Sequence, residues 1–221
     1  MALSRRLQSI LSMIEPCHRL LDIGSDHALL CIEAIKQNKA KHAIAADNKP
    51  GPISKAIKNI ETHQLLDKVT PVLSDGATNI EQQADCIVVA GLGAETIINI
   101  IKQSPDNFKQ ANQLIFSPHS KVELLRKYLY NNGYKIIKEQ LVYDDKYYVM
   151  IYAIYTGDNL PYTLDKMYLG QLKKDVLYPE WIEHLTRYYK SLTIKNNEYN
   201  SIYQLFNQEY DRIQSVGMDG D

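Results

Sequence analysis

Short apolar runs alternate with amphipathic segments along the first two thirds of the chain. Runs such as RLLDI at 19–23 and CIVVA at 86–90 are apolar on both faces, as strands buried in a parallel sheet must be. The segments between the runs place apolar residues three and four positions apart, the spacing of a helix packed on one face. This alternation predicts a doubly wound α/β sheet. The predicted parallel strands are 19–23, 42–46, 69–73, 86–90 and 114–116.

The pattern predicts a hairpin at the end of this sheet. Residues 135–143 and 147–155 are strand-like, and the polar segment DDK at 144–146 joins them. A hairpin brings an antiparallel strand into the sheet, which the plain dinucleotide-binding fold does not require. We therefore expect seven strands, of which the last is antiparallel.

A helical tail follows the turn-forming segment GDNLP at 157–161. From Leu185 to Ile213 apolar residues recur at steps of three and four, a heptad seam with Lys195 and Glu209 as its polar members. Either an antiparallel helical hairpin within the chain or a partner chain could cover this seam, and we favour the hairpin and a monomer. The predicted divisions are a ligand-binding domain at 1–157, a coiled-coil-like helical domain at 158–215 and a disordered tail at 216–221.

The first 16 residues predict an amphipathic helix and not a secretory signal, because polar residues interrupt the apolar ones. No apolar run approaches the roughly 18 residues of a membrane span. The three cysteines, Cys17, Cys31 and Cys86, are widely spaced and form no C-x-x-C pair, which argues against a disulfide framework and a zinc site. We expect a cytoplasmic protein without a metal or a membrane segment.

The net charge of −1 is informative because nucleic-acid-binding proteins usually present a basic surface. The helical tail is no basic arm, since residues 160–221 hold 7 Lys and Arg against 9 Asp and Glu. Any phosphate-binding patch must therefore be local, and each candidate could equally belong to a solvated charged face. The candidates are Arg5, Arg6, Lys121, Arg126 and Lys127.

The first chemical signal is the segment DIGSDH at 22–27, where the first strand turns toward a helix. Gly24 allows the backbone to approach a ligand closely. A dinucleotide fingerprint, G-x-G-x-x-G, would need further glycines where this chain has Asp26 and Leu29. Asp26 would repel a pyrophosphate, but it suits S-adenosylmethionine, which has a sulfonium, an ammonium and no phosphate. This charge argument favours a methyl donor over a nicotinamide, although Asp26 could also simply cap the helix.

Three further signals follow the next three strands, whose carboxyl ends share one edge of the sheet. Asp47 is placed to accept the ribose hydroxyls, and Asp75-Gly76 to meet the adenine edge. The small residues AGLG at 90–93 leave room for the methyl group and an incoming base. Taken singly, the last two could be an ordinary Asp-Gly turn and a tight strand-to-helix turn. The predicted cofactor-binding residues are Asp22, Gly24, Ser25, Asp26, His27, Asp47, Asn48, Asp75, Gly76, Ala90, Gly91, Leu92 and Gly93.

These segments resemble the bacterial tRNA (adenine-22-N1)-methyltransferase family. The stretch LDIGSDHA at 21–28 is similar to that family's first motif, AGLG at 90–93 to its Ala-Gly-Met-Gly segment, and LSRRL at 3–7 to its start. Ala94 departs from the family, where a glycine is common. The resemblance covers nearly the whole chain. It implies a Rossmann-like class I methyltransferase sheet, S-adenosylmethionine as cofactor, tRNA as partner, and methylation of N1 of adenine 22 in the D-arm.

The residues after the fourth strand agree with attack by a ring nitrogen. Enzymes that methylate an exocyclic amine typically carry Asn/Asp-Pro-Pro-aromatic there, and this chain has AGLG instead. Adenine N1 has an in-plane lone pair, and methylation makes the base a cation that a carboxylate would stabilise. Asp26 is the first catalytic candidate and His27 the second, although a histidine there is more often structural. Most of the rate should come from alignment of methyl and nitrogen.

Three alternatives remain open from the sequence alone. The first is an S-adenosylmethionine-dependent methyltransferase that acts on a small molecule or a protein, with the same cofactor residues. The second is a nicotinamide oxidoreductase, which the single-glycine loop disfavours. The third is a non-catalytic RNA-binding module that kept the fold.

Overall fold

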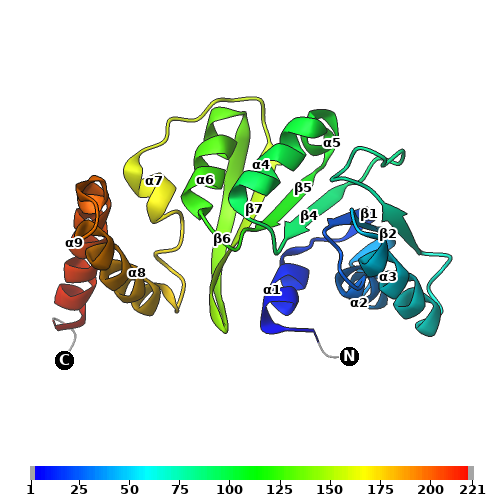
Figure 1. The fold of residues 1–221 in the computed structure, drawn as a ribbon, viewed down its shortest axis with the longest axis horizontal. Coiled ribbons are helices and arrows are strands. Elements are labelled where there is room, and N and C mark those ends of the chain that lie inside the picture. Colours follow the sequence, from blue (N-terminus) through cyan, green and yellow to red (C-terminus); the bar gives the residue numbers. More distant parts are fainter. Residues whose placement is uncertain (1–2, 219–221) are drawn as a thin grey trace. The chain divides into compact units, whose positions relative to one another are not determined.

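The computed structural model describes residues 3–218, which form two compact units (Figure 1). The first unit ends at Tyr162 and the second begins at Thr163. The sequence placed this boundary five residues earlier, after residue 157.

The first unit is built on a seven-stranded sheet of order β3-β2-β1-β4-β5-β7-β6 within the described residues. The pairings among β1 to β5 are parallel, and β7 is antiparallel to both of its neighbours. The fold class and the antiparallel last strand predicted from the sequence are therefore confirmed. The strands are β1 Cys17–Ile23, β2 Ala40–Asp47, β3 Val69–Leu73, β4 Cys86–Ala90, β5 Gln113–Ser117, β6 Tyr134–Asp144 and β7 Lys146–Tyr155.

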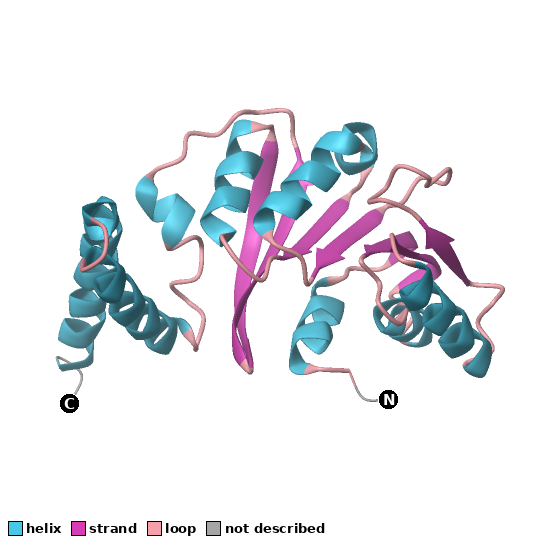
Figure 2. Ribbon diagram, in the orientation of Figure 1, coloured by secondary structure: helices cyan, strands magenta, loops and turns pink. Residues whose placement is uncertain are grey.

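Helices cover both faces of this sheet (Figure 2). The helices α1, α2 and α3 pack in series as one layer, and α4, α5 and α6 form the other. Their bounds are α1 Arg5–Met13, α2 Leu29–Lys36, α3 Pro50–Thr62, α4 Ala94–Gln103, α5 Pro105–Gln110 and α6 Val122–Asn131. None of the helices within residues 3–218 is long and apolar enough to cross a membrane.

The core lies between the central strands and the two helical layers. Leu20 and Leu21 on β1 point to opposite faces, as successive strand residues do, and both are fully buried. Ile10 of α1 and Val88 of β4 are equally buried in one apolar cluster. Burial on both faces explains why these strands read as continuous apolar runs.

Two local features differ from the sequence-based expectations. Helix α2 does not follow the DIGSDH segment directly but begins at Leu29, because Ala28 adopts a left-handed conformation with φ of 56°. Helix α5 was not predicted, although Pro105 in its first turn is a common helix start.

The strand order reverses between β1 and β4, because β2 and β3 lie on one side of β1 and β5, β7 and β6 lie beyond β4. In open α/β sheets the crevice at such a reversal is where ligands bind, outside the carboxyl ends of the strands. The chain positions that follow β1, β2, β3 and β4 therefore meet at one edge of the sheet.

The second unit is a helical hairpin, as predicted, in which α8 and α9 cover part of each other's apolar faces. It contains α7 Leu164–Tyr168, α8 Tyr178–Thr193, the short 3₁₀ helix η1 Asn197–Tyr199 and α9 Asn200–Met218, with α8 packed on α9. Trp181 and Ile182 of α8 and Phe206 of α9 form its buried centre.

The predicted seam is wrong in the middle of the tail. Tyr188 of α8 is 50% exposed, and Lys195 is also exposed, since it lies beyond the end of α8 at Thr193. The tail was also predicted to be disordered from residue 216, whereas α9 continues to Met218. The rest of that prediction, residues 219–221, lies outside the described residues.

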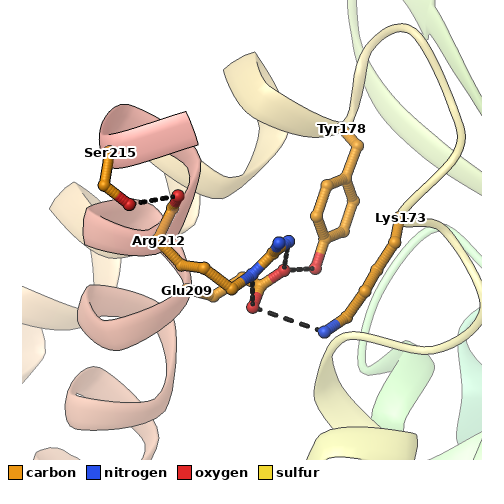
Figure 3. Close-up of polar contacts among 5 residues, drawn as sticks. All are labelled: Lys173, Tyr178, Glu209, Arg212 and Ser215. Carbon is orange, nitrogen blue, oxygen red and sulfur yellow. Dashed lines mark hydrogen bonds and ion pairs between the residues drawn. The ribbon is translucent and has the colours of Figure 1, made fainter. Parts of the chain in front are cut away.

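A buried carboxylate explains the polar position late in the seam. Figure 3 shows Glu209 between three donors: the Tyr178 hydroxyl 3.0 Å away, the Arg212 Nη2 at 2.7 Å and the Lys173 Nζ at 3.4 Å. The hydrogen bonds from Arg212, and then from Tyr178, hold the pKa of Glu209 below its usual range. This cluster joins α9 to the start of α8 and to the segment that precedes it.

Candidate functional site

A cavity of about 410 Å³ lies at the carboxyl ends of the central strands. Its volume is in the range of small-molecule sites, roughly 300–1,000 Å³. The loops after β1, β2, β3 and β4 all contribute to its wall, so the sequence signals after these four strands meet in one place. The predicted site residues on this wall are Gly24, Asp26, Asp47, Asn48, Asp75, Gly76, Ala90, Gly91 and Leu92.

A second cavity of about 160 Å³ adjoins the first, since Gly24, Asp26 and Ala90 line both. Its wall holds three more of the predicted residues, which are Asp22 near the end of β1 and Ser25 and His27 in the loop after it. Gly93 lines neither cavity. It is the N-cap of α4, and a Cβ there would lie 3.4 Å from the Ser120 hydroxyl.

Two glycines shape the floor of the site through their backbone. Gly24 has φ of 80° and Gly91 has φ of 75°, a left-handed region in which an L side chain is strained. The Gly24 and Ser25 amides both donate to the Ala46 carbonyl of β2, at 2.9 and 3.0 Å, and the Gly91 amide donates to Ser117 of β5. Each loop is thereby fixed to a neighbouring strand.

Asp22 is the buried acid of the site. It is 6% exposed, and burial raises its pKa to about 6. The Ser25 hydroxyl opposes this shift in pKa, and the negative charge of Asp47 adds to it. A cationic ligand would restore the ionised form of Asp22, whereas a diphosphate would disfavour it further.

The other acids of the site lie at strand ends. The Asp47 carboxylate accepts the Lys49 amide at 2.9 Å, which orients it at the end of β2. Asp75 follows β3 in a tight turn, where a Cβ on Gly76 would lie 3.1 Å from Ile100 of α4. With Asp22 and Asp26 these acids give the two cavities four carboxylates. The four carboxylates and the left-handed Gly24 fit S-adenosylmethionine, which carries a sulfonium and an ammonium.

Asp26 and His27 face each other at the rim. The His27 Nε2 lies 3.2 Å from the Asp26 Oδ2, and the Asp26 side chain is 67% exposed. The alternative that Asp26 caps α2 is wrong, because Ala28 occupies the N-cap position and no side chain caps that helix. Asp26 therefore remains available to a ligand in the cavities that it lines.

The structure separates the candidate phosphate contacts. Arg126 is fully buried, and its Nε lies 2.7 Å from the buried Glu139, so the prediction of an RNA contact there is wrong. Arg5 and Lys127 are exposed, and Lys121 pairs at the surface with Glu95 at 2.9 Å.

Arg6 differs from the other phosphate candidates because it lines both cavities. Lys49, Thr96 and Ile100 were not predicted as site residues, although all three line the larger cavity. For two of these three residues, the sequence contained a signal that pointed to the site. Lys49 directly follows the Asp47 and Asn48 pair, and Thr96 lies in the first turn of the helix after the AGLG loop.

Comparisons with known proteins identify the family that this chain resembles. A family model described as a methyltransferase domain matches residues 3–151. The chain is 31% identical over 193 residues to the tRNA (adenine(22)-N(1))-methyltransferase of Bacillus subtilis, which covers 83% of this chain and 81% of the relative.

Two solved structures share the fold over nearly the whole chain. One is M. capricolum TrmK in complex with its natural cofactor product S-adenosyl-homocysteine, with 28% identity, 98% of each chain covered and a TM-score of 0.79. The other is a protein of the NADB-Rossmann superfamily from Streptococcus agalactiae, with 26% identity, 98% of this chain and 97% of that chain covered, and a TM-score of 0.84. The chain therefore belongs to the methyltransferase-domain proteins and, within them, to the tRNA (adenine-22-N1)-methyltransferase family.

Proposed function

We propose that this protein transfers the methyl group of S-adenosylmethionine to N1 of adenine 22 in tRNA. The observation that carries the proposal is the pair of adjoining cavities lined by four carboxylates, in a chain that matches a curated tRNA (adenine(22)-N(1))-methyltransferase along most of its length. The bound cofactor supplies an electrophilic methyl group.

The cofactor residues divide along the two cavities. Asp47, held by the Lys49 amide, is proposed to accept the ribose hydroxyls, and Asp75-Gly76, on the wall of the larger cavity, to meet the adenine edge. The smaller cavity, with Asp22, Ser25 and His27, is suited to the cationic amino-acid end. An ammonium group next to Asp22 would compensate the buried negative charge of this carboxylate.

Asp26 is the residue that we propose to act on the acceptor base. Its carboxylate lines both cavities and is largely exposed, so it can approach a base at the rim while it remains near the cofactor. Methylation of N1 leaves a positive charge on the ring, and a nearby carboxylate stabilises that charge or accepts an N6 proton. His27, in contact with Asp26, orients it and is the second candidate.

The loop after β4 favours a ring nitrogen as the acceptor. Ala90, Gly91 and Leu92 line the larger cavity without a polar side chain that could hold an exocyclic amine. Adenine N1 needs no such group because its lone pair lies in the ring plane. This edge of the base pairs in a duplex, so the adenine must be unpaired before it can enter.

For the RNA itself, Arg5, Lys121 and Lys127 remain the proposed phosphate contacts. Their simultaneous replacement by glutamine should weaken tRNA binding and reduce its dependence on salt.

We also propose that the protein acts as a monomer in the cytoplasm, where tRNA is found. Light scattering at micromolar concentration tests the monomer, and a stable dimer would overturn it.

The direct test of the reaction uses unmodified tRNA and cofactor with a labelled methyl group, followed by mapping of the modified nucleoside. We expect one 1-methyladenosine at position 22, and no transfer to a matched tRNA with guanosine at that position. Methyl transfer to a protein or a small molecule with no transfer to tRNA would overturn the proposed acceptor. Binding of tRNA without any transfer would favour a non-catalytic module.

A further inference from the structure

The hairpin of β6 and β7 extends past the edge of the sheet where the two cavities lie. Phe116 of β5 pairs with Ile151 of β7, and β5 ends one residue later, at Ser117. Strand β7 is antiparallel to β5 and begins at Lys146, so its first residues lie beyond the carboxyl end of β5. Tyr147 lies roughly 13 Å beyond the pair of Phe116 and Ile151, at about 3.3 Å per residue. Figure 1 shows the paired ends of β6 and β7 projecting beside α1.

The two faces of this projecting segment meet different surroundings. Tyr148 lies on the face that α1 covers, where the guanidinium carbon of Arg6 is 5.1 Å from the centre of the tyrosine ring. Successive side chains of a strand point to opposite faces, so the adjacent Tyr147 lies on the other face. Its cross-strand partner Tyr143 lies there with it.

Tyr143 and Tyr147 form an aromatic pair on that face. Their ring centres are 5.0 Å apart with an interplanar angle of 69°, which is an edge-to-face contact. Tyr143 is nevertheless 47% exposed. A ring that is already held in position loses little conformational entropy when a ligand packs against it. The pair therefore offers a preorganised aromatic surface at the end of the hairpin.

The charges at the end of the hairpin balance one another. Asp144 accepts the Arg6 amide at 3.1 Å, and Asp145 accepts the Tyr148 hydroxyl at 3.2 Å. The cationic groups of Arg6 and Lys146 each lie 5.1 Å from the centre of the Tyr148 ring. Because these two acids meet two cations, we do not expect the end of the hairpin to attract a phosphate by charge. Its contribution to binding should come from the exposed aromatic ring.

The position of Tyr143 suits a base next to the target adenine and not the target itself. Tyr143 lines neither cavity, whereas the adenine that receives the methyl group must reach the cofactor in them. The adenine has to leave its stack to do so, and its neighbour in the RNA strand thereby loses a stacking partner. An aromatic side chain can replace that partner for any base, since every base has a π-face.

We infer that Tyr143 stacks on the base of a nucleotide that flanks the target adenine in tRNA, and that Tyr147 holds the Tyr143 ring in place for this contact. The inference rests on the proposed methyl transfer to tRNA. It adds to the proposed phosphate contacts a contact with a base, which supplies affinity by stacking and not by charge. The hairpin is then part of the RNA-binding surface and not only the end of the sheet.

Binding of unmodified tRNA and of S-adenosyl-homocysteine to full-length variants tests the inference. Tyr143→Ala should raise the Kd for tRNA about 5- to 50-fold. The Kd for S-adenosyl-homocysteine should stay unchanged, and so should the slope of log Kd for tRNA against log salt concentration, because no charge is removed. Tyr143→Phe keeps the ring and should bind tRNA within about twofold of the wild type. Leu66→Ala is the control, because Leu66 is 58% exposed but lies just before β3, at the opposite edge of the sheet.

Abasic tRNAs identify the stacked base. An abasic site at one of the two nucleotides that flank the target adenine should weaken binding by the wild type, whereas Tyr143→Ala should bind this tRNA and the unaltered one equally. Equal weakening of both proteins by the abasic site at each flank would overturn the inference. Unchanged tRNA binding by Tyr143→Ala, or an equal loss in Tyr143→Phe, would also overturn it. If the wild type neither binds nor methylates tRNA, the proposed function itself fails, and this outcome is distinct from the others.

Discussion

Replacement of Asp22 by asparagine should stabilise the protein without cofactor, and more so at higher pH. Asp22 is buried, and its pKa is raised from 3.8 to about 6. A carboxyl whose pKa is raised by folding favours the native state below pH 3.8, and this contribution is lost as the pH rises through about 6. The ionised aspartate therefore costs the native state about 3 kcal/mol at pH 8.

The pH dependence separates this cost from other effects of the substitution. The same two pKa values give a smaller cost at pH 5, so the stability difference between Asp22→Asn and the wild type should grow by roughly 1–2 kcal/mol from pH 5 to pH 8. Packing of the asparagine amide adds an offset that does not depend on pH and cancels in this comparison. For a chain of this length the change corresponds to roughly 3–6 °C in the melting temperature.

The assay must report on the first unit. The single tryptophan, Trp181, lies in the second unit, so its fluorescence follows the wrong part of the chain. Urea unfolding followed by far-ultraviolet circular dichroism, with hydrogen exchange of the β1 amides, measures the sheet that carries Asp22. A stability difference that stays constant from pH 5 to pH 8 would refute the reasoning, because it would show that ionisation of Asp22 carries no cost.

The same substitution should impair ligand binding. A bound ammonium favours the ionised form of Asp22, so S-adenosyl-homocysteine should bind Asp22→Asn about 10- to 100-fold more weakly at pH 8. In the wild type, binding near pH 6 should release a proton, which calorimetry in two buffers of different ionisation enthalpy detects. Equal affinity of the variant and the wild type, with no proton release, would remove Asp22 from the ligand site.

Three further substitutions test other parts of the account. Asp47→Asn should weaken cofactor binding about tenfold or more through loss of the charged ribose acceptor, and calorimetry showing unchanged affinity would remove it from the site. Asp26→Ala should lower kcat strongly while the melting temperature stays within about 2 °C, and single-turnover rates equal to those of the wild type would exclude its catalytic role. Glu209→Gln should destabilise the helical unit by about 1–2 kcal/mol at pH 7, as followed by Trp181 fluorescence. The pKa of Glu209 is lowered, so this effect should vanish as the pH falls below that pKa, and an effect that persists in acid would contradict the cluster.

The sheet could be predicted from the sequence because its central strands β4 and β5 are buried along almost their whole length, and the partly buried edge strand β3 also reads as a short apolar run. Strands β3 and β4 begin and end where their apolar runs do, at 69–73 and 86–90. The β6–β7 hairpin was also predicted from its polar turn. By contrast, the left-handed conformation of Ala28 shifts the start of α2 to Leu29. The sequence does not indicate this conformation, since alanine is an ordinary helix former.

The part of the site that follows from the order of the strands along the chain could be predicted from the sequence. The residues directly after four consecutive strands meet because the carboxyl ends of parallel strands share an edge, and Asp22, Gly24, Asp47 and Gly91 all line the cavities. From the sequence, Arg6 is a candidate phosphate contact and not a cavity residue, because its position depends on the packing of α1 against the hairpin. Contacts between segments about 138 residues apart, as between Arg6 and Asp144, do not follow from local patterns.

The placement of the sulfonium cofactor among the acids at the carboxyl ends of β1 to β4 is the central claim, and a crystal structure with S-adenosyl-homocysteine tests it most directly. The account predicts adenosine density between Asp47 and Asp75 and the amino-acid end beside Asp22 and Arg6. Ligand density at another surface, or density in the cavity with neither Asp22 nor Asp47 within hydrogen-bonding distance, would contradict it.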